Sequence, residues 1–489
     1  MDLETIGNAE DRLLVLLQIH ICRGHTRDVY IVYPNCTILC KMPINRYNSV
    51  PADVALLSQP LKFEFSGRVA KNRFYKASMI EDLATWSPTN IEERGIPTKE
   101  LIELYRRWGE NEWGVIATGS IDIEFDMPGF IGDGIITPEC SPSGPRFDAF
   151  QELASAAKAN GSLVIGQINH PGRQLFAKFR KDTISASAIQ MPPKTGSYAV
   201  PREATKDDIA RIIDGFAHAA EYLQKAGFDG IQIHGAHGYL VAQFLSEISN
   251  QRTDEYGGSL ENRIRLVVEI AEEIRRRTKP GFILGIKFNS VEFQEKGIKP
   301  TEAKTMCEKL QEMGFDFVEL SGGNHEDVGY GSKKESTLKR EAYFLEFVRD
   351  IVPHLSKTKK YLTGGFRTVG AMVKALEILD GIGLGRPATQ EPRLPNDILA
   401  GKVTGAIRPR DEILNDLAAS LSAAGAQMRQ IAKGQEPVDL SDPSVVESLQ
   451  EEFRNHFGKV VADGDKLEFR GFPDLKAPGM TAHPYGEAY

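Results

Sequence analysis

Between residues 73 and 400, short apolar runs typical of β-strands alternate with segments whose apolar residues recur at helical spacing. Strict alternation favours a parallel sheet with right-handed crossovers, and eight repeats favour a closed barrel. The predicted fold is therefore α/β, a (β/α)8 TIM barrel. A doubly wound open sheet is the alternative, although no Gly-x-Gly-x-x-Gly turn follows an early strand. The predicted strands are 73–79, 115–119, 162–168, 229–234, 282–288, 315–320, 360–363 and 381–384, and the predicted helices are 100–108, 147–159, 206–226, 262–276, 302–313, 341–355, 369–379 and 392–400.

The segments outside this repeat differ from it in character. Residues 1–55 carry no clear period and form a predicted N-terminal extension, and an initiation site at Met42 would make residues 1–41 an artefact of annotation. Residues 56–402 are assigned to the barrel and 403–489 to a C-terminal appendage. In that appendage a helix is expected over 412–431. The remainder, rich in Gly, Pro, Asp and Glu, is expected to be an irregular tail that covers a barrel face or contacts a partner subunit, as in a homo-oligomer.

Composition excludes several classes of function. Apolar residues make up 41% of the chain, which is enough for a large core. The net charge of −8 gives no sign of the basic surface that binds nucleic acids. The five cysteines are scattered, which predicts neither a disulfide framework nor a metal site. Leu13–Ile21 is too short to span a membrane, and acidic residues precede it, unlike a secretory signal. These features predict a cytoplasmic protein that binds no metal, membrane or nucleic acid.

The stretch from Asp229 to Tyr239 concentrates chemistry at one strand end. Ile231 and Ile233 alternate with Gln232 and His234, so the two polar side chains share one face of the strand. Glycines then let the backbone turn, and His237 and Tyr239 follow at once. Either histidine alone could be a satisfied structural residue, but two imidazoles and a phenol together at a barrel strand end predict an active site.

Other strand ends add a cofactor-sized set of groups. Gly119 ends the second strand and Gln167 the third, and Gln167 suits the amide edge of a heterocycle unless it bonds a neighbouring strand. Lys287 ends the fifth strand, and a lysine inside a barrel needs an anionic ligand or a carboxylate such as Glu319.

A phosphate site is predicted after the last two strands, from the glycine pair at 364–365 and from Gly385 with Arg386. A phosphorylated heterocycle fits all of these groups. Flavin mononucleotide and pyridoxal phosphate remain alternatives on this basis, although with pyridoxal phosphate His234, His237 and Tyr239 would have no evident role in the reaction.

The motifs themselves resemble those of the old yellow enzyme family, in the NADH:flavin oxidoreductase / 2,4-dienoyl-CoA reductase-like branch and in a fungal-type form. The resemblance covers about residues 60–400. It is carried by Gly166-Gln-Ile-Asn-His-Pro-Gly-Arg173, Ile233-His-Gly-Ala-His-Gly-Tyr-Leu240, Ser249-Asn-Gln-Arg-Thr-Asp-Glu-Tyr-Gly-Gly-Ser-Leu-Glu-Asn-Arg263, Lys71-Asn-Arg73, Leu362-Thr-Gly-Gly365 and Gly383-Leu-Gly-Arg386.

The resemblance implies an ene-reductase with non-covalent FMN that NADH or NADPH reduces. His234 and His237 would hold the oxygen of an enone or enal, whose β-carbon accepts hydride from flavin N5, and Tyr239 would protonate the α-carbon. The signature at 250–263 is predicted to be structural, with Arg252, Asp254 and Arg263 tying the chain to the barrel. The implied cofactor residues are Ala77, Ser78 and Met79 along the flavin, Gly119, Gln167 at the pyrimidine edge, Lys287 near N1 and O2, and Gly364, Gly365, Phe366, Gly385 and Arg386 at the phosphate.

Two positions depart from the family pattern. Lys287 stands where members often carry arginine, which keeps the charge but loses the planar fork, and Ile80 stands where many carry Thr or Cys. No cysteine follows Cys307, which argues against the branch with an iron–sulfur cluster. The alternatives to ene reduction are an NAD(P)H oxidase that passes electrons to oxygen and a redox-silent barrel acting as an isomerase or binding protein.

Overall fold

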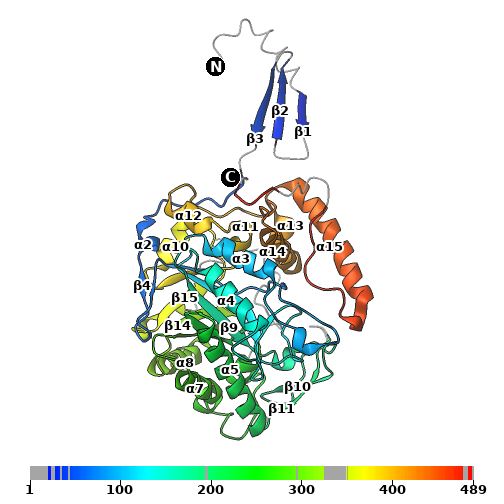
Figure 1. Cartoon of the computed structure of the whole chain (residues 1–489). Helices are drawn as coiled ribbons and strands as arrows, with labels where there is room; N and C mark the ends of the chain where they lie inside the picture. Colours follow the sequence, from blue (N-terminus) through cyan, green and yellow to red (C-terminus); the bar gives the residue numbers. More distant parts are fainter. Residues whose placement is uncertain are drawn as a thin grey trace.

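Parallel strands of the computed structural model close into a barrel with helices packed around it (Figure 1). The structure describes residues 20–23, 28–33 and 36–41 as backbone, and residues 44–192, 197–292, 296–323, 348–349, 351–476 and 483–486. The segment Leu13–Ile21 and the helix expected at 341–355 lie largely outside these residues. In the described part of the chain no helix is both long and apolar enough to cross a membrane.

Eight of the described strands make up the barrel wall, because the sheet order runs from β6 through β16 to β7 and a further pairing joins β6 to β7. The predicted (β/α)8 barrel is therefore confirmed. The wall consists of β6 (Phe74–Lys76), β7 (Val115–Asp122), β9 (Leu163–Asn169), β12 (Gly230–Gly235), β13 (Ile283–Val291), β14 (Phe317–Gly322), β15 (Lys359–Thr363) and β16 (Gly381–Leu384).

The surrounding helices begin at the caps that their sequences supply. The Thr205 side chain accepts from the Asp208 amide in a capping box, and Ser259 caps the next long helix. Apolar faces of these helices pack on the outside of the strands in one continuous core. The outer layer contains α3 (Lys99–Gly109), α4 (Pro145–Ala157), α5 (Lys206–Lys225), α7 (Leu260–Arg277), α8 (Pro300–Glu312), α10 (Val369–Ala375), α11 (Pro387–Gln390) and α12 (Leu394–Leu399), with the shorter α2 (Ala55–Ser58) and α6 (Leu240–Leu245).

A second, smaller core fills the barrel interior toward the N-terminal ends of the strands. Tyr75 lies with its ring centroid 5.0 Å from that of Tyr361 and 6.1 Å from that of Phe317. These rings are buried together with Phe63, which comes from the chain before the barrel. Because side chains fill this end, a ligand can enter only from the C-terminal ends of the strands.

Excursions and appendages surround the barrel mouth. After β9 the chain forms the parallel pair β10 (Asp182–Ser185) and β11 (Val200–Glu203), and β8 (Gly134–Ile135) pairs in parallel with the end of β7. The predicted N-terminal extension contains an antiparallel sheet of β1 (His20–Arg23), β2 (Asp28–Tyr33) and β3 (Cys36–Lys41), and the short β4 (Leu61–Lys62) and β5 (Val69–Ala70) pair with each other.

The C-terminal region is more regular than its composition predicts. The helix expected at 412–431 is split into α13 (Asp411–Leu414) and α14 (Leu417–Ala432). The prediction of an irregular tail after residue 432 is wrong, since α15 (Pro443–Asp463) begins at the Asp442 cap and runs along one side of the barrel (Figure 1). Val445, Val446, Leu449 and Phe453 recur at helical spacing and form its buried face.

Candidate active site at the barrel mouth

β12 carries His234 to the mouth of the barrel because its polar face is turned inward. Gln232 Nε2 donates to Glu319 Oε2 on β14 over 2.8 Å, across the barrel interior. His234 lies two residues further along, on the same face and one layer closer to the strand's end. Its Nδ1 accepts from the Ala236 amide at 3.4 Å, which places the ring proton on Nε2.

The turn after β12 brings the other two polar rings against His234. His237 has a φ of +58° and Gly238 a φ of +79°, so the backbone folds back within two residues. The His234 ring centroid lies 5.4 Å from that of His237 and 4.5 Å from that of Tyr239. Ser321 Oγ on β14 lies 2.8 Å from His237 Nε2 and fixes that ring. The structure thus brings the three predicted catalytic residues together.

Tyr239 is a buried phenol in acidic surroundings. Burial raises its pKa well above the ordinary value, and the nearby carboxyls of Asp133 and Asp122 raise it further. Burial also raises the pKa of Asp122, to about 7, although the Gly129 amide donates to its Oδ2 over 2.7 Å and opposes this rise. Tyr239 therefore keeps its proton at neutral pH.

A chain of hydrogen bonds runs across the layer below the histidines. Ser78 Oγ donates to Gln167 Oε1 over 2.8 Å, and Gln167 Nε2 donates to Gln232 Oε1 over 2.7 Å. Gln167 thus makes the hydrogen bond to a neighbouring strand that was one of its two predicted roles. The strand that carries it, β9, ends at the mouth of the barrel. Ala77 is buried and Met79 half-buried next to Ser78 on the chain that leaves β6.

Lys287 and Glu319 form a buried ion pair in the same layer. Lys287 Nζ lies 3.1 Å from Glu319 Oε1, with side chains only 6% and 0% exposed. Tyr75 donates its hydroxyl to Glu319 Oε2 over 3.0 Å. Glu319 is therefore the partner of Lys287, and the cation lies directly across the β13–β14 register from it.

Gly119 is required by packing inside the protein. Its amide donates to Glu81 Oε1 over 2.8 Å, and a Cβ built at this position would lie 1.9 Å from Glu81 Oε2. It would also lie 2.5 Å from the carbonyl oxygen of Met79. The glycine thus allows the chain after β6 to approach β7, which sets the place of the predicted flavin-lining residues.

The predicted phosphate loops have the backbone that such a site requires. Gly364 and Gly365 have φ values of 139° and 86°, conformations that only glycine adopts readily. A Cβ on Gly385 would meet nothing closer than the Met79 sulfur at 3.9 Å, so there is space beside the Gly385 backbone. The buried Thr363 hydroxyl at the end of β15 has no hydrogen-bond partner among the described residues. Phe366, by contrast, is fully buried in the outer core.

Arg386 is held by the C-terminal appendage. It caps α11, and its guanidinium donates to Ser420 Oγ on α14. Beside this contact, Thr389 Oγ1 donates to Gln427 Oε1 over 2.9 Å. Ser420 was not singled out from the sequence, because nothing local marks a serine inside a helix as a partner of a distant arginine.

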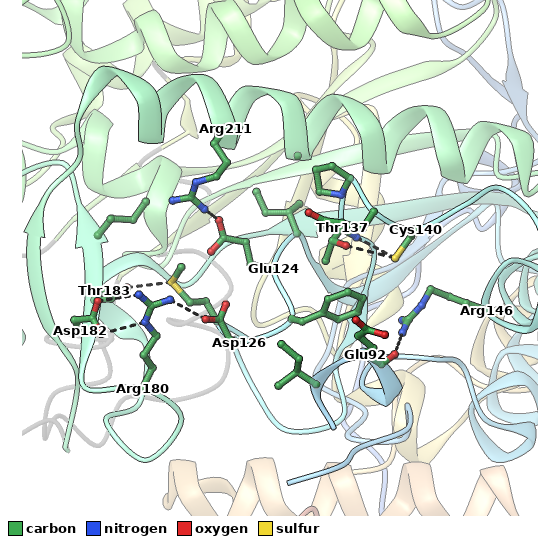
Figure 2. A pocket seen from close by; sticks show the side chains of 18 of the residues that line it. Glu92, Glu124, Asp126, Thr137, Cys140, Arg146, Arg180, Asp182, Thr183 and Arg211 are labelled. Carbon is green, nitrogen blue, oxygen red and sulfur yellow. Dashed lines mark hydrogen bonds and ion pairs between the residues drawn. The ribbon is translucent and has the colours of Figure 1, made fainter. Parts of the chain in front are cut away.

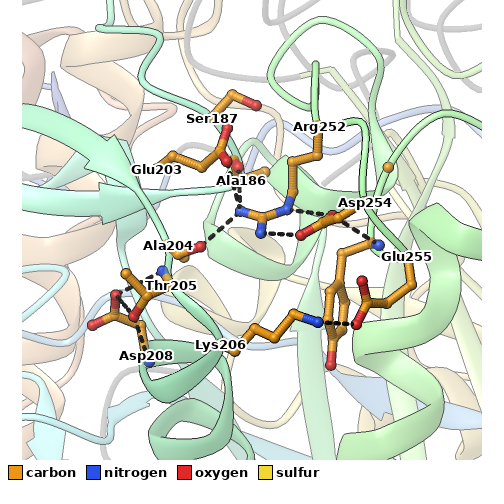
Figure 3. A network of polar contacts seen from close by, with 12 residues as sticks. Ala186, Ser187, Glu203, Ala204, Thr205, Lys206, Asp208, Arg252, Asp254 and Glu255 are labelled. Atoms are coloured by element: carbon orange, nitrogen blue, oxygen red, sulfur yellow. Dashed lines mark hydrogen bonds and ion pairs between the residues drawn. The ribbon is translucent and has the colours of Figure 1, made fainter.

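The signature at 250–263 makes the structural ties expected of it (Figure 3). Arg252 donates to the carbonyl oxygens of Ala186 at 3.0 Å and Ala204 at 2.7 Å, and its ion pair with Asp254 measures 2.6 Å. Arg263 donates to the Leu245 carbonyl over 2.7 Å. The Arg252 contacts hold the excursion after β12 against that after β9, and the Arg263 contact fixes α7 to the end of α6.

A large cavity lies outside the barrel mouth, between the loop after β7, strand β10 and helix α5 (Figure 2). Its volume is about 830 Å³, and neither Gln167 nor the three rings at the end of β12 line it. The Arg180 guanidinium lies 2.7 Å from Asp126 and 2.9 Å from Asp182, and Arg211 pairs with Glu124. These ion pairs neutralise part of the charge that lines the cavity.

Comparison with known proteins identifies the redox family. Residues 57–403 match the model of the NADH:flavin oxidoreductase / NADH oxidase family. The chain belongs to this family. It is 48% identical over 401 residues to the NADH-dependent flavin oxidoreductase nadA of Aspergillus parasiticus, covering 81% of this chain and 90% of the relative. It is 34% identical to the NADH-dependent flavin oxidoreductase iccE of Talaromyces variabilis, over 68% of this chain and 84% of that one.

Solved structures agree on the fold. An old yellow enzyme homologue from Zymomonas mobilis has a TM-score of 0.58 at 24% identity and covers 74% of this chain and 98% of its own. A 2-naphthoyl-CoA reductase in complex with 2-naphthoyl-CoA has a TM-score of 0.67 at 22% identity, over 82% of this chain and 59% of its own. The family model and the NADH-dependent relatives thus confirm the predicted NADH:flavin oxidoreductase family, with FMN as the cofactor and NADH or NADPH as the reductant, and the solved structures confirm the old yellow enzyme fold. The glycine conformations and buried donors at the barrel mouth fit such a cofactor.

Proposed function

We propose that this oxidoreductase reduces the activated C=C bond of a small enone or enal. The observation that carries the proposal is the contact of the His234, His237 and Tyr239 rings at the end of β12, where His234 stands opposite the buried Lys287 in the β12–β13 register. When bound, FMN supplies hydride transfer from NADH or NADPH to the acceptor. The protein's own groups must then polarise the acceptor and supply its proton.

The two histidines suit the acceptor's carbonyl oxygen. The Ala236 amide occupies His234 Nδ1, so Nε2–H of that ring is a donor. Ser321 Oγ lies 2.8 Å from His237 Nε2 and holds that ring beside His234. Hydrogen bonds from the two histidines to the carbonyl oxygen would withdraw electron density from the alkene as negative charge develops on the oxygen.

Tyr239 suits the proton transfer to the α-carbon. Its ring contacts that of His234, so a substrate oxygen held by the histidine would bring the adjacent carbons near the phenol. Its raised pKa keeps the hydroxyl protonated before each turnover. Lys287 and Gln167 are proposed to contact the flavin ring, with Ala77, Ser78, Met79 and Gly119 along it, and Gly364, Gly365, Phe366, Gly385 and Arg386 at its phosphate.

The competing function is oxidation of NADH or NADPH with oxygen as the acceptor, which the family description includes. Anaerobic assays with cyclohexenone separate the two. We expect NADH consumption and formation of the saturated ketone in equal amounts without oxygen. NADH consumption that requires oxygen, with no saturated product, would overturn ene reduction and leave the oxidase.

Replacing His234 with alanine is expected to weaken binding of phenolates, which mimic the polarised enone oxygen, by about 10- to 100-fold. A charge-assisted hydrogen bond contributes about 1.5–3 kcal/mol, and each 1.4 kcal/mol is a factor of ten. Titration of the oxidised enzyme with a phenol, followed through the flavin absorbance, measures the affinity. Replacement of the half-buried His218, which bonds the Cys140 carbonyl on the outside of the barrel, is the matched control. Equal affinities for all three proteins would contradict the assignment of His234.

Replacing Ser420 with alanine is expected to weaken FMN binding by roughly 3- to 10-fold, and Ser420→Thr should restore it. Removing one hydrogen bond of about 1 kcal/mol would leave the Arg386 guanidinium less well oriented toward the phosphate. Quenching of FMN fluorescence on titration with apoprotein gives the affinity directly. Ser448→Ala on α15, whose hydroxyl donates to the Ser444 carbonyl, serves as the control. Unchanged FMN affinity in Ser420→Ala would show that the appendage does not act through Arg386.

A further inference from the structure

Residues 467–471, the C-terminal segment that follows α15, fold back over the rim of the barrel mouth. After α15, the Leu467 carbonyl accepts from Trp86 Nε1 at 3.1 Å. Arg470 donates from one guanidinium nitrogen to the Ala84 carbonyl over 3.1 Å. Both partners belong to the segment that leaves β6, so the C-terminal segment is attached directly to the chain that runs past Met79 into the rim.

A cavity of about 100 Å³ lies beneath this segment. It is partly open to solvent, and aromatic side chains supply much of its wall. Phe130 and Phe179 each contact Phe176, with ring centroids 5.8 Å and 6.2 Å apart. Asp82 and, from α15, Val460 also line it.

Asp82 supplies a hydrogen-bond acceptor in a wall that also contains the cations Lys178 and Arg470. It has a φ of +55°, so its backbone is held in a conformation unusual for any residue but glycine, asparagine or aspartate. Its Oδ1 is buried and accepts no hydrogen bond from the described part of the chain. A buried acceptor without a donor costs about 1–3 kcal/mol, which a ligand hydroxyl in the cavity would recover.

The cavity adjoins the proposed redox site through two neighbouring contacts. Gln174 Nε2 donates to the His237 carbonyl over 3.0 Å, and Phe176 follows two residues later. The Phe176 ring also stacks on Tyr198 at 5.1 Å, and Tyr198 is near enough to Tyr239 to contribute to raising the pKa of that phenol. Phe176 thus lines the cavity on a stretch of chain that also contacts the turn carrying His237.

We propose that this cavity is the outer part of the acceptor site and that it binds an aromatic ring bearing a hydroxyl group, which donates to Asp82. The proposal rests on the ene-reductase function and adds the class of acceptor. Ring faces and edges of the phenylalanines suit a planar aromatic partner. An apolar cavity of roughly 150 Å³ holds a benzene molecule, so a partly open one of about 100 Å³ suits a single ring better than a fused system.

Val460 and Val461 offer a matched pair for the test. Val460 lines the cavity, whereas Val461, the next residue of α15, is 81% exposed. Val460→Trp fills the cavity and Val461→Trp adds the same group to the solvent side. Both are assayed anaerobically with para-hydroxybenzylideneacetone, which carries the ring, and with methyl vinyl ketone, which lacks it.

We expect Val460→Trp to lower kcat/KM for para-hydroxybenzylideneacetone at least tenfold and to leave methyl vinyl ketone unaffected, whereas Val461→Trp should change neither. Asp82→Asn keeps a side chain that tolerates positive φ but removes the charge. It should reduce the preference for para-hydroxybenzylideneacetone over unsubstituted benzylideneacetone several-fold, and this variant decides the matter if Val460→Trp does not fold. Equal effects of Val460→Trp on both enones, or no effect on either, would overturn the proposal, as would an unchanged hydroxyl preference in Asp82→Asn.

A direct binding measurement separates this proposal from the redox assignment. Calorimetric titration of the oxidised holoenzyme with para-hydroxybenzylideneacetone needs no turnover. If the wild-type enzyme reduces neither enone, ene reduction fails, while affinity lost only in Val460→Trp still supports the cavity. If both tryptophan variants bind the ring as tightly as the wild type, the cavity is not part of the site, whatever the enzyme reduces.

Discussion

Replacing Tyr239 with phenylalanine is expected to slow reduction of the enone by about 10²- to 10⁴-fold while leaving reduction of the bound flavin by NADH unchanged. A positioned general acid typically contributes a rate enhancement of this size. Phenylalanine retains the buried ring against His234, so packing at the end of β12 is preserved and only the hydroxyl is lost. Anaerobic stopped-flow absorbance at the flavin bands measures the two half-reactions separately.

The separation of the two half-reactions is the informative result, because a folding defect or lost cofactor would slow both. Tyr198→Phe is the matched control, since Tyr198 is a nearby phenol that stacks on Phe176 and has no contact assigned to the chemistry. Equal losses in both half-reactions of Tyr239→Phe, or equal slowing in the Tyr198 variant, would remove Tyr239 from the role of proton donor.

The barrel could be predicted from the sequence because parallel strands that are buried on both faces appear as short apolar runs. The predicted ends are less accurate where polar residues are buried. β13 continues to Val291, three residues beyond the predicted end, through Asn289 and Ser290, which are fully buried. Their polarity suggested a loop. The place of Asn289 in the strand is fixed by tertiary contacts, such as its acceptance of the His237 amide proton over 3.3 Å.

The helix α15 was missed although its signals are present. Pro443 stands at the first turn after the Asp442 cap, which is typical of a helix start. The average composition of residues 433–489 concealed a 21-residue helix between two irregular stretches. The cavity beneath the C-terminal segment could not have been found in this way, because Asp82 and Arg470 meet only once the chain has folded back.

Which side chains pair inside the barrel was the feature least predictable from the sequence. Lys287 was open to two interpretations, a flavin contact or a pair with Glu319, and the choice depends on strand register. β13 and β14 pair Lys287 with Glu319 directly, which gives the ion pair without excluding a cofactor above it. The same layer therefore serves stability and the proposed cofactor site together.

Glu319→Gln is expected to lower the free energy of unfolding by about 3–5 kcal/mol, the usual cost of leaving one member of a buried ion pair without its partner. The carboxylate is fully buried and also accepts from Tyr75 and Gln232, so the amide would leave the Lys287 charge uncompensated and disturb both hydrogen bonds. Urea unfolding followed by circular dichroism, with FMN at a fixed saturating concentration, measures the difference. Glu312→Gln, whose pair with Lys309 is exposed, should cost no more than about 1 kcal/mol.

A double variant distinguishes the charge from the packing. Lys287→Met together with Glu319→Gln removes both charges and keeps the side chains near their original sizes, so it should recover much of the stability that Glu319→Gln loses. If the double variant is no more stable than the single one, the hydrogen bonds of Glu319 account for the loss. If Glu319→Gln unfolds at the wild-type urea concentration, the Lys287 charge must reach solvent or another anion, and Lys287 would then no longer be a buried cation available to the flavin ring.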